Sequence, residues 1–394
     1  MSTFLSGLLL SATLFLLVPA GMLLVEVLAS LVPARSRPAS GRRAAGVEIL
    51  IPAHDEEQAI GGTIAAIRAQ MLAMDRLVVI VDNCADRTAD IARAAGAEVV
   101  ERVDKSRHGK GYALAAGLAF VKANEPRGII VFIDADCTLT PHSLDELFAA
   151  SQETGGPVQA RDTLRRAARR GAFANILEFA WRVRNDVRPR GAMALGLPCH
   201  LMGTGMAIPL RLLDDIDLAT GHVAEDLQLG LQLTAMGHPP HFCGAAEVTS
   251  QFAPTDDGRQ VQKQRWVHGH LASIVEHVPK LVRTAWRRRD AKLLAVAADL
   301  SIPPLALLGV MQVLAIAASA LLALATGRTA ALATAAIGLL ASGTALAAAW
   351  WQCGRDIVRL VDLAGLPTYI GRQLLSGLLY IGRRRSTWAR SQRS

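Results

Sequence analysis

Three long apolar segments constrain the fold of this chain more than any other feature. Residues 4–33 carry a single charge, Glu26, and residues 303–326 and 329–352 carry none. An α-helix rises 1.5 Å per residue, so about 20 apolar residues cross the hydrocarbon core of a bilayer. Uncharged helices of this length are uncommon in soluble folds. The sequence therefore predicts three membrane helices that flank a soluble region.

A cleaved signal peptide is the alternative interpretation of the first segment. Its apolar run is longer than that of an ordinary signal peptide, and no basic residue precedes it. It also lacks a clear site of small residues for cleavage. These features favour a retained membrane helix.

Arginine clusters border the predicted membrane helices and indicate their orientation. Short loops rich in Lys and Arg stay on the cytoplasmic side. We therefore expect the N-terminus outside, and residues 35–300 and the tail in the cytoplasm, in an inner or plasma membrane. The net charge of +8 then indicates attraction to anionic membrane lipid. Nucleic acid is not an expected partner, because the cations form no stripe with interleaved aromatics; protein partners are not indicated. The clusters are Arg35, Arg37, Arg42 and Arg43; Arg283 and Arg287–Arg289; and Arg383–Arg385.

The region 46–280 alternates short β-rich runs with amphipathic stretches. Runs at 47–53, 76–82, 97–102 and 128–136 are apolar on both faces or nearly so, and helical patterns separate them. This alternation predicts an α/β domain with a mostly parallel, Rossmann-like sheet covered on both sides. We expect a basic membrane-helix region at 1–45, this domain at 46–280, and interfacial segments with a membrane hairpin at 281–394. Residues 161–190 are rich in arginine and fit no element.

Acidic side chains follow three of the predicted strands. Asp55 and Glu56 follow the first, Asp82 follows the second, and Asp134 and Asp136 follow the fourth. Such aspartates are also common helix N-caps, but two carboxylates two residues apart repel each other unless a cation lies between them. Oxygen ligands suit Mg²⁺ or Mn²⁺, which bind diphosphates. Lys110, between two glycines, can hold phosphate or be a solvated loop lysine. No G-x-G-x-x-G or P-loop is present.

These segments resemble glycosyltransferase family 2, an inverting family with the GT-A fold. The resemblance rests on "IPAHDEE", "VDNCADRTADIA", "HGKGYAL", "DADCTLTP", "GTGMAIP", "AEDLQLGLQL" and "QKQRW", in the expected order between about 46 and 270. With the flanking apolar helices, the chain is similar to the membrane-integrated branch that includes cellulose, hyaluronan and chitin-oligosaccharide synthases.

The resemblance implies a role for each matching residue. Asp134 and Asp136 would coordinate the metal, and Asp226 would be the general base. The spacing Q-x-x-R-W would bind diphosphate and acceptor, although an amphipathic surface helix is the plainer interpretation of that stretch. The sequence "AHD" replaces the usual first motif and leaves nucleobase selection open. The implied donor-binding residues are Pro52, His54, Glu56, Asp82, Lys110 and Asp134, and the implied diphosphate and acceptor residues are Glu225, Gln262, Arg265 and Trp266.

The expected reaction is transfer of a hexosyl or N-acetylhexosaminyl group from a nucleotide-sugar, with UDP the usual nucleotide. A catalytic face near the bilayer, and an apolar stretch at 357–382 that suits the interface or a further hairpin, favour a polyprenyl-linked acceptor in envelope or exopolysaccharide synthesis. Two alternatives remain: a processive polysaccharide synthase, and an inactive membrane scaffold, which the full set of acidic groups disfavours.

Overall fold

The computed structural model describes residues 2–33, 43–164, 172–221, 224–250 and 256–365. These residues fall into two compact units. The sheet unit takes residues from 34–165 and 198–262, and the helical unit takes residues from 1–33, 166–197 and 263–387. The two units are described separately below.

The sheet unit is built on one eight-stranded mixed sheet with the order β3-β2-β1-β4-β7-β6-β8-β5. The first four strands in that order pair in parallel. Strand β7 is antiparallel to both of its neighbours, β4 and β6, while β6 and β8 are parallel. The predicted α/β class is confirmed. The strands are β1 Glu48–Ala53, β2 Arg76–Asp82, β3 Glu98–Arg102, β4 Ile129–Phe132, β5 Thr138–Leu139, β6 Val158–Leu164, β7 Met206–Pro209 and β8 His241–Ser250.

Helices cover both faces of this sheet, as a parallel sheet requires. Alternate residues of β1 point to opposite faces: Ile49 and Ile51 join the core under α2, α3 and α5, and Leu50 joins the core under α4 and α8. All three side chains are fully buried. These helices are α2 Ile60–Arg68, α3 Thr88–Ala94, α4 Lys110–Ala123, α5 Ser143–Thr154 and α8 Glu225–Ala235.

The order of the strands creates a topological switch point in the sheet unit. Strand β1 pairs with β2 on one side and with β4 on the other, so the chain continues from β1 to one side of it and returns on its other side at β4. Ligands of open α/β sheets bind beyond the carboxyl ends of the strands at such a switch point. The segments that follow β1, β2 and β4 begin at His54, Asn83 and Ile133, and they carry most of the polar residues singled out above.

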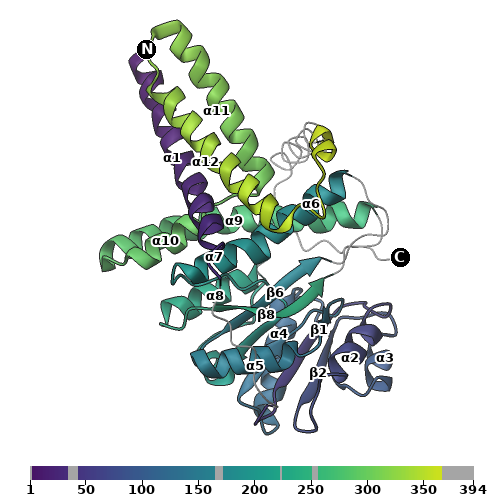
Figure 1. The fold of residues 1–394 in the computed structure, drawn as a ribbon. Helices are drawn as coiled ribbons and strands as arrows, with labels where there is room; N and C mark the ends of the chain where they lie inside the picture. The colour runs from purple at the N-terminus through teal and green to yellow at the C-terminus, as the bar shows by residue number, and fades with distance from the viewer. Residues whose placement is uncertain (1, 34–42, 165–171, 222–223, 251–255, 366–394) are drawn as a thin grey trace. The chain divides into compact units, whose positions relative to one another are not determined.

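Among the residues that the structure describes, the helical unit contains three helices that are long and apolar enough to cross a membrane. They are α1 Ser2–Ala29, α11 Leu305–Thr326 and α12 Ala330–Cys353, and they lie side by side in Figure 1. They correspond to the three predicted apolar segments. Other helices of this region are α6 Ala172–Arg182, the π-helix Val183–Val187, α7 Arg188–Ala194, α10 Ala291–Leu300 and the 3₁₀ helix Leu360–Gly365. Helix α9, Asp256–Arg288, has its residues up to Gln262 in the sheet unit and the rest in the helical unit. The arginine-rich stretch that fitted no element is therefore helical from residue 172.

A buried ion cluster joins α1 to two other helices of this unit. The guanidinium of Arg188 in α7 donates to Glu26 of α1 at 2.9 Å and to the side chain of Asp299 in α10. Contact between α1 and α7 is close, since a Cβ added at Gly191 would lie 1.9 Å from the carbonyl oxygen of Glu26. The single charge of the first apolar segment is thus paired inside the protein.

Arg43 corrects one part of the sequence interpretation. Its side chain is buried in the sheet unit, where it donates to Asp75 at 2.8 Å and to Asp145 at 2.6 Å. It links the segment before β1 to two other parts of the domain, and its assignment as a membrane-flanking cation is wrong. Arg35, Arg37, Arg42 and Arg383–Arg385 lie outside the described residues, as does 366–382 of the apolar tail.

Candidate active site

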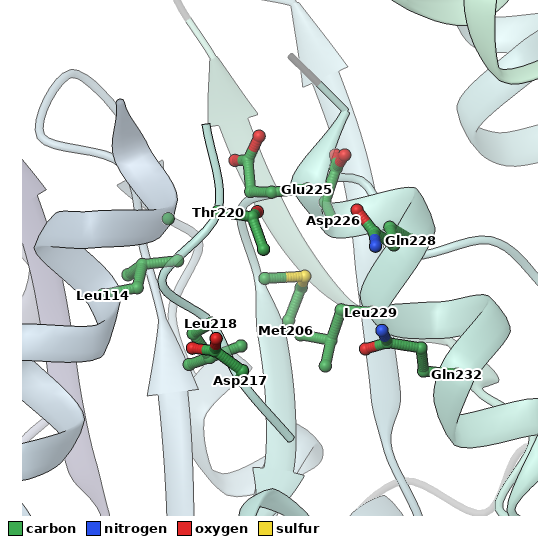
Figure 2. A pocket seen from close by; sticks show the side chains of 11 residues that line it. Leu114, Met206, Asp217, Leu218, Thr220, Glu225, Asp226, Gln228, Leu229 and Gln232 are labelled. Carbon is green, nitrogen blue, oxygen red and sulfur yellow. The ribbon is translucent and has the colours of Figure 1, made fainter. Parts of the chain in front are cut away.

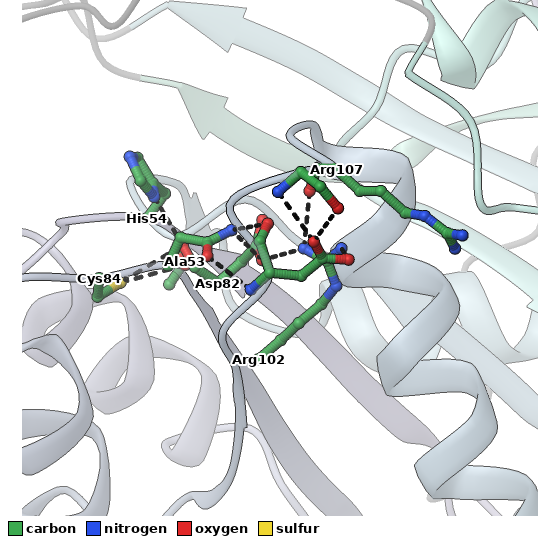
Figure 3. A network of polar contacts seen from close by, with 9 residues as sticks. Ala53, His54, Asp82, Cys84, Arg102 and Arg107 are labelled. Carbon is green, nitrogen blue, oxygen red and sulfur yellow. Dashed lines mark hydrogen bonds and ion pairs between the residues drawn. The ribbon is translucent and has the colours of Figure 1, made fainter.

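The ends of β1 and β2 meet in a polar network (Figure 3). The His54 ring nitrogen Nδ1 lies 2.6 Å from the backbone oxygen of Asp82. The Asp82 carboxylate accepts from Arg102 at 2.5 Å and from Asn83 at 3.0 Å. Two of the predicted donor-binding residues, His54 and Asp82, are therefore neighbours, and Arg102 fixes the carboxylate of the second.

The other predicted donor residues near this edge lie on the backbone of β1 and the turn after it. Pro52 is within β1 and faces Ile80 of β2 in the register. The backbone nitrogen of Glu56 donates to the hydroxyl of Thr88 at 2.8 Å. The turn after β1 is thereby attached to the start of α3, close to His54.

The D-x-D aspartates lie directly after β4, beside a buried cysteine. Ligand atoms of Asp134, Asp136 and Cys137 lie within 4.8 Å of one another. Burial, followed by the charges of Asp136 and Asp134, raises the pKa of the Cys137 thiol well above its ordinary value. Two carboxylates side by side provide the oxygen donors that Mg²⁺ and Mn²⁺ prefer, so the residues present fit such an ion.

Lys110, the first residue of α4, lies between two groups of carboxylates. Its Nζ is 2.5 Å from Asp134 and 3.9 Å from Glu225, and it donates to the backbone oxygen of Gly203 at 2.8 Å. Burial lowers the pKa of Lys110, but Asp134 and Glu225 outweigh this effect and hold the pKa above its ordinary value. Lys110 is therefore a cation at neutral pH.

Gly203 makes this convergence possible. Its φ of +87° is a conformation that side chains rarely adopt. A Cβ added there would lie 3.1 Å from Asp226 Oδ2 and 3.1 Å from Lys110 Nζ. The glycine thus lets the backbone approach the lysine and the acidic pair at the same time.

Glu225 and Asp226 open α8 and border a pocket (Figure 2). In the view, both carboxylates lie at one end of it, and the opposite end holds apolar Leu218 and Leu229 together with Asp217 and Gln232. Gln228 and Gln232, four residues apart, add polar groups from the same helix. The lining residues are Gly111, Leu114, Met206, Asp217, Leu218, Thr220, Glu225, Asp226, Gln228, Leu229 and Gln232.

The environment of Glu225 makes its ionisation difficult. Its side chain is 17 % exposed. Burial and the neighbouring charge of Asp226 raise the pKa of Glu225 to about 7, although Lys110 acts in the opposite direction. A carboxyl group that titrates near neutral pH is suited to proton transfer, and shifts of this kind are concentrated at functional sites.

The residues of the Q-x-x-R-W spacing all lie in α9 but differ in their surroundings. Gln262 is buried and belongs to the sheet unit. Trp266 belongs to the helical unit, where its ring centroid lies 4.6 Å from that of Trp181 in α6. Arg265 is helical, but its side chain lies outside the described part of the chain.

Several residues of the site were not predicted. Arg102 holds Asp82 and Gly203 receives Lys110, while Asp217, Gln228 and Gln232 line the pocket. Signals existed for Gly203, which opens the segment "GTGMAIP", and for Gln228 and Gln232, which lie in "AEDLQLGLQL". The others are ordinary surface-type residues until the fold brings them to the site.

Comparison with known proteins identifies the family of the chain. A model of the family described as "Glycosyltransferase like family 2" matches residues 44–269, which is more than half of the chain. The chain belongs to this family. The resemblance inferred from the seven segments is confirmed.

One group of curated relatives matches over a shorter stretch. A 4,4'-diaponeurosporenoate glycosyltransferase of Staphylococcus aureus (strain USA300) is 38% identical over 93 residues, which are 23% of this chain and 24% of the relative. The match thus spans about a quarter of the length of these curated relatives.

One solved structure supports the fold. The mannosyltransferase PcManGT from Pyrobaculum calidifontis, in complex with GDP-Man and Mn²⁺, has a TM-score of 0.52 at 18% identity, over 89% of this chain and 97% of that chain. Glucosyl-3-phosphoglycerate synthase from Mycobacterium tuberculosis, in complex with Mn²⁺, UDP and glucosyl-3-phosphoglycerate, scores 0.39 at 23% identity, over 57% and 81%. That lower score carries no weight here. The first structure supports the GT-A fold for this family 2 glycosyltransferase.

Proposed function

We propose that this glycosyltransferase moves a hexosyl or N-acetylhexosaminyl group, with inversion, from a UDP-sugar to a lipid-linked acceptor at the cytoplasmic face of a membrane. Envelope or exopolysaccharide synthesis is the expected setting. The domain boundaries at 45 and 280 and the orientation of the chain are part of this proposal.

One observation carries the proposal: Lys110 connects the D-x-D with the acidic pair. Its Nζ lies 2.5 Å from Asp134 and 3.9 Å from Glu225. A sugar transferase needs a group that holds the donor diphosphate next to a group that accepts the proton of the attacking hydroxyl. The cationic lysine suits the first task, and the carboxylates that open α8 suit the second.

We assign the general base to Asp226 and a supporting role to Glu225. With a pKa near 7, Glu225 is partly protonated at neutral pH, and this limits the negative charge that faces Asp226. Removing a proton from an acceptor hydroxyl strengthens it as a nucleophile. Asp226 would take that proton and Lys110 would stabilise charge that develops on the departing diphosphate.

A divalent cation would be held by Asp134 and Asp136, and when bound it would neutralise diphosphate oxygens. The choice between Mg²⁺ and Mn²⁺ is left to experiment; the PcManGT complex contains Mn²⁺. At the other end of the donor, His54 and Asp82 would contact the nucleoside together with the segment of Pro52 and Glu56. The donor side of the proposal thus follows the carboxyl ends of β1, β2 and β4.

Three observations support an apolar acceptor. The helical unit has three helices able to cross a membrane, and the Staphylococcus aureus relatives are named as glycosyltransferases of 4,4'-diaponeurosporenoate, a carotenoid. The pocket beside Glu225 has an apolar floor that includes Leu114, Met206 and Leu229. Gln262, Arg265 and Trp266 would then contact the diphosphate or the acceptor sugar.

The test is a panel of UDP- and GDP-sugars, incubated with protein in membranes that contain polyprenyl phosphate lipids. We expect one UDP-sugar to be consumed and a single sugar to appear on a lipid product. A product ladder would identify a processive synthase instead. If no nucleotide-sugar were hydrolysed or transferred, under conditions where the protein is folded, the chain would be a scaffold.

A further inference from the structure

One fully buried glutamine, Gln159 of β6, bonds to the backbone through its entire side-chain amide. Its oxygen accepts from the N–H of Met202 at 2.8 Å, and its nitrogen donates to the carbonyl oxygens of Thr204 at 2.8 Å and Ala160 at 2.9 Å. A buried amide is expected to find such partners, because an unpartnered polar group inside a protein costs free energy. What distinguishes Gln159 is the location of two of these partners.

Met202 and Thr204 lie on either side of Gly203, in the segment that precedes strand β7. Residues 202–204 belong to neither a helix nor a strand, so no regular ladder of hydrogen bonds fixes them. The φ of Gly203 is +87°, and glycine has a wider choice of backbone conformations than any other residue. The two bonds from Gln159 therefore restrict the direction in which the carbonyl group of Gly203 points.

The same three-residue segment contacts the candidate donor site. The carbonyl oxygen of Gly203 accepts from Lys110 Nζ at 2.8 Å, and the same Nζ lies 2.5 Å from Asp134. The hydroxyl of Thr204 accepts from the backbone nitrogen of Asp134 at 3.2 Å. The segment thus contacts both the lysine and the first aspartate of the D-x-D, and Gln159 holds the segment at both ends.

A purely structural role for Gln159 in the core of the sheet is the alternative. An apolar residue of similar size would fill the same space, but it would leave the N–H of Met202 and the carbonyl of Thr204 without their buried partner. Loss of those two bonds would act first on Gly203 and Lys110, whereas a general packing defect would act on the whole sheet unit. The two roles therefore predict different results for individual lysines.

We propose that Gln159 is a positioning residue, which holds the two neighbours of Gly203, directs the Gly203 carbonyl group at Lys110 and so fixes the ammonium group beside Asp134. Lysine carries its charge on a flexible four-carbon stem, so the place of the ammonium group depends on the oxygens that receive it. This placement of Lys110 does not depend on sugar transfer. Its further consequence, that Gln159 helps to bind the donor diphosphate, rests on the proposed function.

The first test is the rate at which acetic anhydride labels Lys110, measured by mass spectrometry on the folded full-length protein. The reagent attacks the neutral amine, and the oxygens around Lys110 favour the ammonium form. Gln159→Met keeps a side chain of similar volume and removes the amide. Complete loss of a hydrogen bond to a charged group changes an equilibrium by about ten-fold or more, so partial loss should raise the labelling of Lys110 by about three- to ten-fold.

Two controls separate positioning from a general loosening of the sheet unit. Lys122 lies in the same helix as Lys110 and is paired with Asp214 at 2.8 Å, and its labelling rate should stay unchanged in Gln159→Met. Gln70→Met removes another amide that bonds to two backbone groups, and it should leave the rate at Lys110 unchanged. An unchanged rate at Lys110 in Gln159→Met, an equal rise at Lys122, or the same effect from Gln70→Met would overturn the proposal. If Gln159→Met did not fold, Gln159→Asn would replace it with the same expected rise, because its amide is one methylene too short to reach both partners.

The second test addresses the donor through the affinities for UDP and GDP, measured by calorimetry with Mn²⁺. Lys110→Met and Gln159→Met should each weaken the binding of at least one nucleotide. The double variant should bind it no more weakly than Lys110→Met alone, because both changes act on the same contact. Losses that multiplied in the double variant would show that Gln159 acts independently of Lys110 and would refute its positioning role. If wild type bound neither nucleotide, the proposed function would fail, and the labelling of Lys110 would still decide the role of Gln159.

Discussion

Replacing Glu225 by glutamine tests the electrostatics of the site without any substrate. The pKa of Glu225 is about 7 against an ordinary value of 4.5, chiefly because of burial and Asp226. A raised carboxyl pKa means that the folded state binds the proton more tightly than the unfolded state. The stability from this proton is complete below about pH 4.5 and is lost as the pH rises to about 7.

The size of the effect follows from that difference. Each pH unit is worth about 1.4 kcal/mol, so ionised Glu225 lowers the free energy of unfolding by roughly 3 kcal/mol above pH 7. This is an upper value, since the side chain is 17% exposed and water screens part of the interaction. At about 2–4 °C per kcal/mol for a domain of 150–250 residues, Glu225→Gln should raise Tm by roughly 6–12 °C at pH 8.

The assay is thermal unfolding of both proteins in detergent with a chelator, from pH 5 to pH 8. The gain in Tm should be small at pH 5 and should grow through pH 7. Glu153→Gln provides the control, because Glu153 is an exposed glutamate in α5. A gain for Glu225→Gln that did not change with pH would refute the reasoning, since packing alone would then explain it.

Three further predictions address the metal, the topology and the buried ion cluster. Asp136→Asn, or a chelator added to wild type, should reduce turnover by orders of magnitude while the circular dichroism spectrum stays unchanged. Full turnover in the presence of the chelator would show that the reaction needs no metal. Membrane-impermeant thiol reagents applied from outside should label a cysteine that replaces Arg328 and miss one at position 290, and the reverse pattern would invert the proposed orientation. Arg188→Met removes the cation that two buried carboxylates share, so it should lower stability by about 3–5 kcal/mol in thermal or denaturant unfolding; unchanged stability would show that the cluster contributes nothing.

Local patterns in the sequence were sufficient for the parallel half of the sheet and for the membrane helices. The runs that became β1, β2 and β4 are apolar on both faces, so a parallel sheet with helices on both sides follows from general rules. Because parallel strands end at one edge, the chemistry after β1, β2 and β4 could be placed there from the sequence.

The other half of the sheet and the details of the site depend on distant contacts. Strand β7 has only four residues, and its antiparallel pairing with β4 and β6 is decided by neighbours that no local pattern specifies. Lys110 donates to the backbone oxygen of Gly203, whose φ is positive. Neither this contact nor the backbone conformation of Gly203 can be read from the sequence. Glu26 was visible as a lone charge, but its partner Arg188 lies 162 residues away.

The central claim is that Asp226 removes the proton from the acceptor while the groups around Lys110 hold the donor. General-base catalysis contributes about 10²–10⁴ in rate. Asp226→Asn preserves the size of the side chain and removes only its ability to accept a proton. Asp82→Asn is the matched variant on the donor side, and it should weaken donor binding more than it slows the chemical step.

The decisive measurement is single-turnover transfer by Asp226→Asn, with donor affinity measured by calorimetry on the same protein. The account predicts a rate lower by about 10²–10⁴ and a nearly unchanged Kd for the nucleotide-sugar. Loss of donor binding together with fast single-turnover transfer would contradict it, because Asp226 would then be a ligand of the donor and not the base.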